Sequence, residues 1–158
     1  MQTPELSTDC PTRIELLPKP VEVGQALLPR GTETVLVVAP ERAQREYVVW
    51  VLREQGYTVR EATEGPEAIC LFHTNPNRRI DLVIAEAGMP RSSGKTLAHH
   101  LTKFLPRSRM VIMSAVTRND PLDGDLSYFQ KPITRTALAY QVRQVLDNAA
   151  QAELLAVA

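Results

Sequence analysis

The sequence predicts an α/β fold in which a parallel five-stranded sheet carries helices on both faces. From Glu33 onward, short apolar runs alternate with longer segments of helical periodicity, and this alternation is typical of strands joined by crossover helices. The strand candidates carry few polar residues, as expected where both faces of a sheet are covered. The chain has 158 residues, of which 44% are hydrophobic, so we expect one globular domain of ordinary size.

The first 31 residues differ in composition from the rest. Five of the 12 prolines fall there, and proline at such density opposes both helix and sheet. We therefore expect residues 1–31 to form a mostly extended linker, with one short strand at 13–17. Residues 32–150 are expected to form the domain, and residues 151–158 a carboxyl-terminal tail.

The first half of the domain contains two strand–helix units. Residues 34–38 form an uninterrupted β-branched run, and residues 42–55 have a helical apolar face that ends before Gly56. A second strand is expected at 57–59, and Pro66 suits the first position of the next helix. The apolar residues of these two helices are Tyr47, Val48, Val51, Leu52, Ala68, Ile69 and Phe72.

The second half of the domain continues the alternation. The expected elements are a strand at 81–85, a helix at 95–105, strands at 110–113 and 127–130, and a helix from 134 to about 149. The inward residues expected from the two helices are Leu97, Leu101, Phe104 or Leu105, Leu138, Val142, Val145 and Leu146.

Composition argues against several classes of function. The 18 basic residues balance the 18 acidic ones, so no overall field draws the protein to nucleic acid or to a membrane surface. Cys10 and Cys70 lack the spacing of a zinc site, so we expect reduced thiols, no metal and no cofactor. No apolar run approaches the ~20 residues of a membrane span. We expect a cytoplasmic protein without a membrane or nucleic-acid partner.

Five motifs then point to a known family. They are TVLVV followed by a loop, GYTVREATEGPEA, DLVIAEAGMP followed by SG, VIMSA and YFQKPI, and they fall within residues 33–148. Together they resemble the receiver domain of two-component response regulators and hybrid histidine kinases. The resemblance implies a flavodoxin-like (CheY-like) doubly wound sheet with strand order 2-1-3-4-5. In such sheets the site lies beyond the carboxyl ends of the strands, here in the loops after Val38, Glu86 and Met113.

The resemblance also implies which residues would handle a phosphoryl group. A receiver that accepts phosphate has an Asp after the third strand, two acids after the first strand that hold Mg²⁺, a Ser or Thr after the fourth and a Lys after the fifth. Ser114 and Lys131 stand at the last two positions, and Lys131 precedes Pro132, a bond that is cis in the family.

The remaining positions have changed in ways that oppose phosphorylation. Ala39 and Pro40 replace the acid pair and offer no side-chain oxygen to Mg²⁺, and Glu41 is one residue too far along for more than a weak rescue. Glu86 replaces the acceptor Asp, and its extra methylene moves the carboxylate by roughly an ångström or more. We therefore expect a non-phosphorylatable receiver, here called a pseudo-receiver, that is not an enzyme. Glu86 either pairs with Lys131 and holds one signalling state, or is a vestige without effect on output.

The connection between the fourth and fifth strands is short. Only 17 positions separate Ser114 from Lys131, whereas receivers usually place a whole helix in this interval. Residues 116–126 contain Pro, Gly and three Asp and show no helical face. We expect the fourth helix to be shortened or absent, which would expose the edge of the fifth strand and one side of the last helix.

Receivers usually contact partners or dimerise through this face, and its side chains give three further readings. Arginine and tyrosine suit a protein interface, and they equally suit binding of a nucleotide phosphate. They are also compatible with ordinary solvated side chains. The candidate binding residues are Arg118, Tyr128, Gln130, Pro132, Arg135, Tyr140 and Arg143.

The main hypothesis is a regulatory binding module that docks on a histidine kinase or on another receiver, a second copy included. The alternative is a sensor of a nucleotide second messenger such as cyclic di-GMP at the same face, and the third is a Mg²⁺-dependent phosphoacceptor. The stretch TRIELLPKP also resembles the end of a histidine kinase ATP-binding domain that passes into an attached receiver. This weaker likeness implies a partner kinase within one polypeptide.

Overall fold

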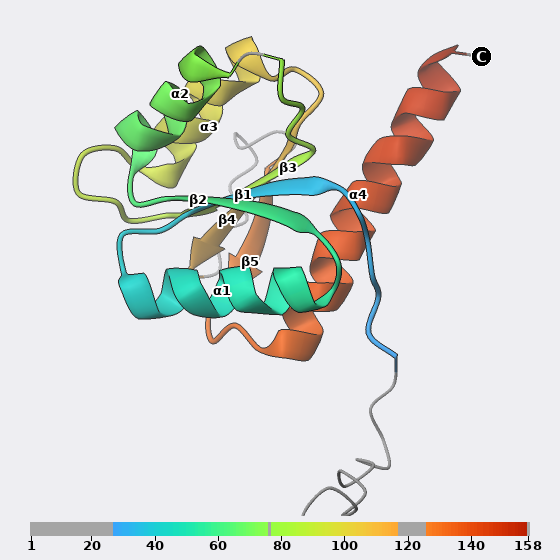
Figure 1. Ribbon diagram of the computed structural model, residues 1–158, viewed down its shortest axis with the longest axis horizontal. Helices are drawn as coiled ribbons and strands as arrows, with labels where there is room; N and C mark the ends of the chain where they lie inside the picture. The colour runs from blue at the N-terminus through green and yellow to red at the C-terminus, as the bar shows by residue number, and fades with distance from the viewer. Residues whose placement is uncertain (1–26, 76, 117–125, 158) are drawn as a thin grey trace, which may run out of the picture.

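The computed structural model describes residues 27–75, 77–116 and 126–157 and confirms the predicted α/β fold (Figure 1). Its five parallel strands form one sheet in the order β2-β1-β3-β4-β5, as the resemblance implied. The strands are β1 (Thr34–Val38), β2 (Thr58–Ala62), β3 (Leu82–Glu86), β4 (Arg109–Ser114) and β5 (Ser127–Gln130). The helices are α1 (Arg42–Glu54), α2 (Gly65–Thr74), α3 (Gly94–Phe104) and α4 (Arg135–Val157).

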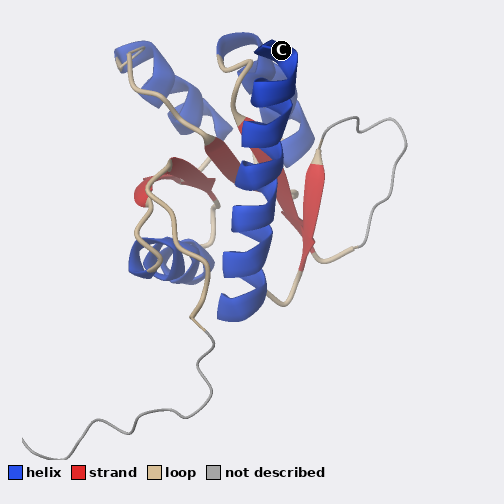
Figure 2. Cartoon of the chain, turned by 90° about the vertical axis from the view of Figure 1, so that its right-hand side faces the viewer, coloured by secondary structure: helices blue, strands red, loops and turns tan. Residues whose placement is uncertain are grey.

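Helices cover both faces of the sheet. In Figures 1 and 2, α2 and α3 lie on one face, and α1 and α4 lie on the other. Alternate residues of the buried strands supply the two core clusters: Val35 and Val37 face α1 and α4, whereas Leu36 and Val38 face α2 and α3. The central strands are therefore apolar on both sides, which explains why they appear in the sequence as uninterrupted β-branched runs.

Four helices are present in the described part of the chain, consistent with a shortened or absent fourth helix of the family. Residues 117–125 lie outside the described residues, and so do the predicted strand at 13–17 and the candidate Arg118. The residues that flank this segment, 115–116 and 126, are not helical.

The last helix is longer than expected. We predicted its end near residue 149 and a tail at 151–158, but α4 continues to Val157. Its final turns project beyond the sheet (Figure 1), and Leu154, Leu155 and Val157 are more than 70% exposed there. The apolar periodicity that marks a core-facing helix stops where the sheet stops. Alanine, glutamine and leucine continue the helix by propensity alone.

Tyr47 was predicted to face the core and is exposed instead, whereas of the alternatives Phe104 or Leu105 the second packs inward. Tyr47 and Phe104 are 38% and 55% exposed. Val49 takes the inward place on α1, and Leu105 rather than Phe104 packs against the cluster under α3. Both aromatic residues lie at the edge of their helix's apolar stripe, where periodicity alone cannot distinguish a buried residue from an exposed one.

The chain enters β1 through a cluster that we call the entry clamp, formed by Gly31, Glu33, Tyr57 and Arg143. The Arg143 guanidinium binds both oxygens of the Glu33 carboxylate, at 2.7 and 3.0 Å, and donates to the Tyr57 hydroxyl at 3.5 Å. The hydrogen bond from Arg143 lowers the pKa of Glu33, and burial raises the pKa of Tyr57. A Cβ atom at Gly31 would stand 2.2 Å from the Tyr57 ring. The clamp thus joins the start of β1 to α4.

Candidate functional site

The candidate site lies at the carboxyl edge of the sheet. Glu86 ends β3, Ser114 ends β4, and Lys131 directly follows β5. Because the strands are parallel and hydrogen-bonded in sequence, their carboxyl ends meet at one edge and bring these three residues together. The peptide bond between Lys131 and Pro132 is cis, as the family resemblance implied.

An ion pair occupies the centre of this edge. The Lys131 ammonium lies 2.9 Å from Oε2 of Glu86, and the two side chains are 30% and 12% exposed. This is the pairing that the sequence predicted in the first of its two readings of Glu86. Partial burial makes such a pair depend on further hydrogen bonds, because each charge has lost part of its water.

Gln44 supplies those hydrogen bonds and was not predicted. Its Nε2 donates to Oε2 of Glu86 at 2.9 Å, and its Oε1 accepts from the Lys131 ammonium at 3.2 Å. Gln44 lies in the first turn of α1, one helical turn before the buried Val48. A polar residue in line with the apolar face of a helix was the signal in the sequence, but its partners lie 42 and 87 positions away along the chain.

The loop after β1 offers little to a cation. Ala39 is fully buried and Pro40 is exposed, and Glu41 is an exposed residue that precedes α1. The Arg45 guanidinium takes the backbone oxygens of this loop, at 2.7 Å from Ala39 and 3.5 Å from Pro40. A positive side chain thus stands where a divalent ion would need oxygen ligands.

The Ser114 side chain has different partners from the Lys131 side chain. It is buried, and its Oγ accepts a hydrogen bond from the Val116 N–H at 3.2 Å. It also borders a cavity of about 400 Å³, together with Lys95 and Tyr128. The residues that line this cavity do not include Lys131, Glu86 or Gln44.

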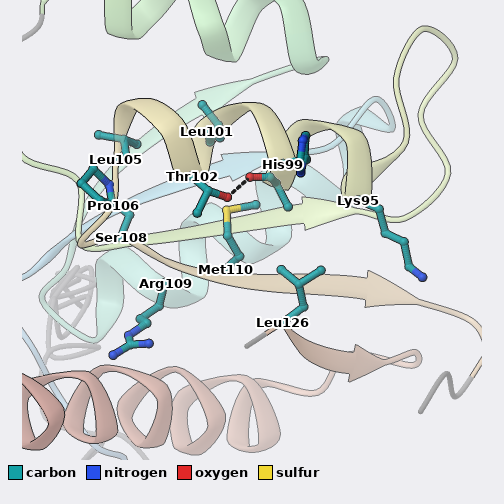
Figure 3. A pocket seen from close by; sticks show the side chains of 11 residues that line it. Lys95, His99, Leu101, Thr102, Leu105, Pro106, Ser108, Arg109, Met110 and Leu126 are labelled. Carbon is teal, nitrogen blue, oxygen red and sulfur yellow. Dashed lines mark hydrogen bonds between the residues drawn. The ribbon is translucent and has the colours of Figure 1, made fainter. Parts of the chain in front are cut away.

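A second cavity, of about 450 Å³, lies between α3 and the start of β5 (Figure 3). Its lining is part polar and part apolar, and Arg109 points away from α3 toward α4 in Figure 3. His99 lines the cavity and is exposed. The apolar lining residues include Leu101, Leu105, Met110 and Leu126.

Six of the seven candidate binding residues lie on β5, just after it, or on α4. Gln130 and Pro132 are exposed, and Tyr128 is partly buried at the first cavity. Tyr140 is 50% exposed on α4. The Gln141 amide donates to the Tyr128 carbonyl at 2.9 Å and so ties α4 to β5.

Two of these candidates, Arg135 and Arg143, have partners on other elements. The Arg135 guanidinium carbon stands 5.4 Å from the centre of the Trp50 ring, so Arg135 faces α1. Arg143 belongs to the entry clamp at the start of β1. The contacts of these two side chains are therefore with α1 and with the start of β1.

The described part of the chain holds no helix able to cross a bilayer and no group of three or more His, Cys, Asp and Glu placed to hold a metal ion.

Comparison with known proteins gives consistent matches. Residues 35–143 match the family model of the response regulator receiver domain. The chain is 33% identical over 123 residues to sensor kinase CckA of Brucella abortus, covering 75% of this chain and 13% of that kinase. It is 29% identical over 122 residues to the autoinducer 1 sensor kinase/phosphatase LuxN of Vibrio harveyi, again covering 13% of the relative. The crystal structure of the receiver domain from hybrid histidine kinase CckA matches with a TM-score of 0.63 and 31% identity, covering 72% of this chain and 98% of that one.

Proposed function

Because the chain belongs to the response regulator receiver family, we propose that it signals without phosphate, as a regulatory binding module in two-component systems. The observation that carries this proposal is the ion pair between Lys131 and Glu86. The lysine that would stabilise an incoming phosphoryl group is already neutralised, and a glutamate stands at the acceptor position. Ala39 and Pro40 contribute no carboxylate for Mg²⁺. We therefore assign to the domain the binding of a partner protein, rather than phosphoryl transfer at this edge of the sheet.

We assign docking to a surface formed by Tyr128, Gln130, Pro132 and Tyr140, called here the β5 surface. Tyrosine suits such a role because it offers large contact area and a hydrogen-bonding hydroxyl at low entropic cost. β5 is the edge strand of the sheet, and the cavity beside α3 reaches Leu126, directly before it. The partner is a histidine kinase or another receiver, a second copy of this chain included.

The relatives support a kinase partner. The two curated relatives named above are sensor kinases, and the chain corresponds to only 13% of their length. Residues 1–31 fit a linker from the end of a kinase ATP-binding domain, and residues 27–31, where described, are neither helix nor strand. Domain and kinase would then share one polypeptide.

One observation keeps a nucleotide second messenger as the alternative partner. The cavity of about 400 Å³ at Ser114, Lys95 and Tyr128 falls within the range of small-molecule sites. Arg135 and Arg143 do not favour this alternative, because they are engaged at Trp50 and Glu33. A cyclic dinucleotide would have to be held without them.

Thermal unfolding against a small panel tests the proposal. A ligand at about 100 times its dissociation constant adds ~2.7 kcal/mol, which raises the midpoint by several degrees. We expect no rise with Mg²⁺, or with Mg²⁺ and beryllofluoride. A rise with beryllofluoride would contradict the proposal and favour a phosphoacceptor. A rise with cyclic di-GMP alone would favour the alternative.

Binding to purified histidine kinases and receivers tests the β5 surface. Tyr140→Ala and Tyr128→Ala are expected to weaken binding of the cognate partner by about tenfold, as for the better residues of an interface. Tyr47→Ala is the matched control, because Tyr47 is an exposed tyrosine on α1, away from β5. Equal loss in all three variants would argue against this surface.

A further inference from the structure

Gln44 contacts both charges of the site, and we infer that it is the positioning residue that holds Lys131 on Glu86 and away from Ser114. The inference rests on the proposed phosphate-independent function and names the side chain that maintains it. Three contacts close a ring: Lys131 to Glu86 at 2.9 Å, Gln44 to Glu86 at 2.9 Å, and Lys131 to Gln44 at 3.2 Å. The ammonium and the amide NH₂ group donate in this ring, and the carboxylate and the amide carbonyl accept.

A primary amide is the group that suits this position. Its NH₂ end donates to the Glu86 carboxylate, and its carbonyl end accepts from the Lys131 ammonium. A glutamate at position 44 would repel Glu86, and a lysine would repel Lys131. A leucine would fill similar space but leave both charges one hydrogen bond short in a partly buried site. The Gln44 Nε2 group also donates a hydrogen bond to the sulfur of Met113, at 3.7 Å.

The ring fixes where the ammonium points. Lys131 is absent from the lining of the cavity that Ser114 borders, and the Ser114 hydroxyl is bonded to the backbone of its own loop. The serine and the lysine therefore face separate surroundings. Gln44 comes from α1, which is anchored by Val48, Val49, Val51 and Leu52, so the amide is presented by a rigid element.

Chemical acetylation of Lys131, followed by mass spectrometry, tests this role. Reaction requires an amine free of its partners, so Gln44→Leu should accelerate acetylation by about fivefold, which corresponds to ~1 kcal/mol for one hydrogen bond. Lys103, exposed on α3, is the internal control and should react equally in both proteins. An unchanged rate at Lys131 would overturn the inference.

Exchange of the residues at positions 44 and 86 tests whether Gln44 positions Lys131 or only supports the fold. In the double variant Gln44→Glu with Glu86→Gln, the carboxylate and the amide exchange places and the ring can still close. We expect Lys131 to react within about twofold of wild type there, and several-fold faster in Glu86→Gln alone. A double variant no slower than Glu86→Gln alone would overturn the inference.

A measurement on the unaltered protein covers the case in which a variant fails to fold. Ammonium protons that are hydrogen-bonded exchange slowly enough to be seen by NMR. The Lys131 ammonium signal should persist where that of Lys103 is lost, and loss of both would overturn the inference. Failure of the inference is distinguishable from failure of the proposed function, because the response of the wild-type protein to beryllofluoride tests phosphate acceptance whichever residue positions Lys131.

Discussion

A single methylene group distinguishes Glu86 from the aspartate of a phosphate-accepting receiver, and the proposed loss of phosphorylation does not rest on this group alone. We predict that Glu86→Asp is not labelled by acetyl phosphate in the presence of Mg²⁺. The reason is that Ala39 and Pro40 still provide no side-chain oxygen for the ion, and Arg45 still covers the loop carbonyls. The measurement is phosphoprotein mass spectrometry, with a competent receiver as positive control. Stoichiometric labelling would contradict the prediction.

The entry clamp predicts a defined pH dependence of stability. Arg143 lowers the pKa of Glu33 from its ordinary 4.5, so the ionised carboxylate stabilises the folded state. This contribution is fully present above the ordinary value and disappears as the pH falls through the lowered one. The difference in unfolding free energy between wild type and Glu33→Gln should therefore be largest above about pH 5.5 and shrink below it.

Denaturant unfolding at a series of pH values checks this prediction. The same measurement on Glu67→Gln gives the pH dependence of a second carboxylate for comparison. Thr63, rather than an arginine, lowers the pKa of Glu67, and the site is remote from the clamp. If the Glu33→Gln difference stayed constant down to about pH 3, Arg143 would not be stabilising the charged form.

At the level of single residues, the family resemblance predicted the part of the site that lies on strand ends. It assigned Glu86, Ser114 and Lys131, and parallel strands bring such positions together. Gln44 and Arg45 could not be found in the same way. They lie on α1, and whether a helix side chain reaches a distant loop depends on helix placement, which one chain's local pattern does not contain.

Among the elements, the turn from α1 to β2 depends most on one residue. Gly56 has φ +97°, and a Cβ there would stand 2.7 Å from the carbonyl oxygen of Gly31. We predict that Gly56→Ala lowers the unfolding free energy by about 1–2 kcal/mol, because both the backbone conformation and the contact oppose a side chain. Gly88→Ala is the matched control, since a Cβ at Gly88 meets nothing within 4 Å. Equal stability of the two variants in urea unfolding would contradict this prediction.

The elements also differ in how well the sequence marked their ends. Gly56 was predicted to follow the end of the first helix and Pro66 to stand at the start of the second. In the structure Gly56 follows α1 with a positive φ, and Pro66 lies in the first turn of α2. The end of α4 was missed by eight residues because no glycine or proline stops it and no core contact is required to continue it. Sequence marks where a helix must stop more clearly than where it is free to go on.

At the scale of the whole molecule, both core clusters are built from residues between Val35 and Leu146. A chain shortened to residues 27–150 should therefore unfold in one cooperative transition with a free energy within about 0.5 kcal/mol of the full chain. Urea unfolding followed by circular dichroism checks this. Separate removal of residues 1–26 and of 151–158 would identify the source of any larger loss.

The fold was predictable at this scale because its signals agree with one another. Strands apolar on both faces, crossover helices and five family motifs all required the same sheet. The binding surface was less predictable: Arg135 and Arg143 share a helix with Tyr140, but contacts to Trp50 and Glu33 turn them elsewhere.

The entry clamp has a mechanical consequence for α4. The clamp and the core contacts of Val142 and Leu146 together hold the first part of α4, and the part beyond Leu146 is about 16 Å long. A tilt of the held part by about 10° would carry the last turn through about 3 Å, more than the shifts of about 1–2 Å by which helices commonly report a change of state. A small movement at the start of β1 would therefore be enlarged at the tip of α4.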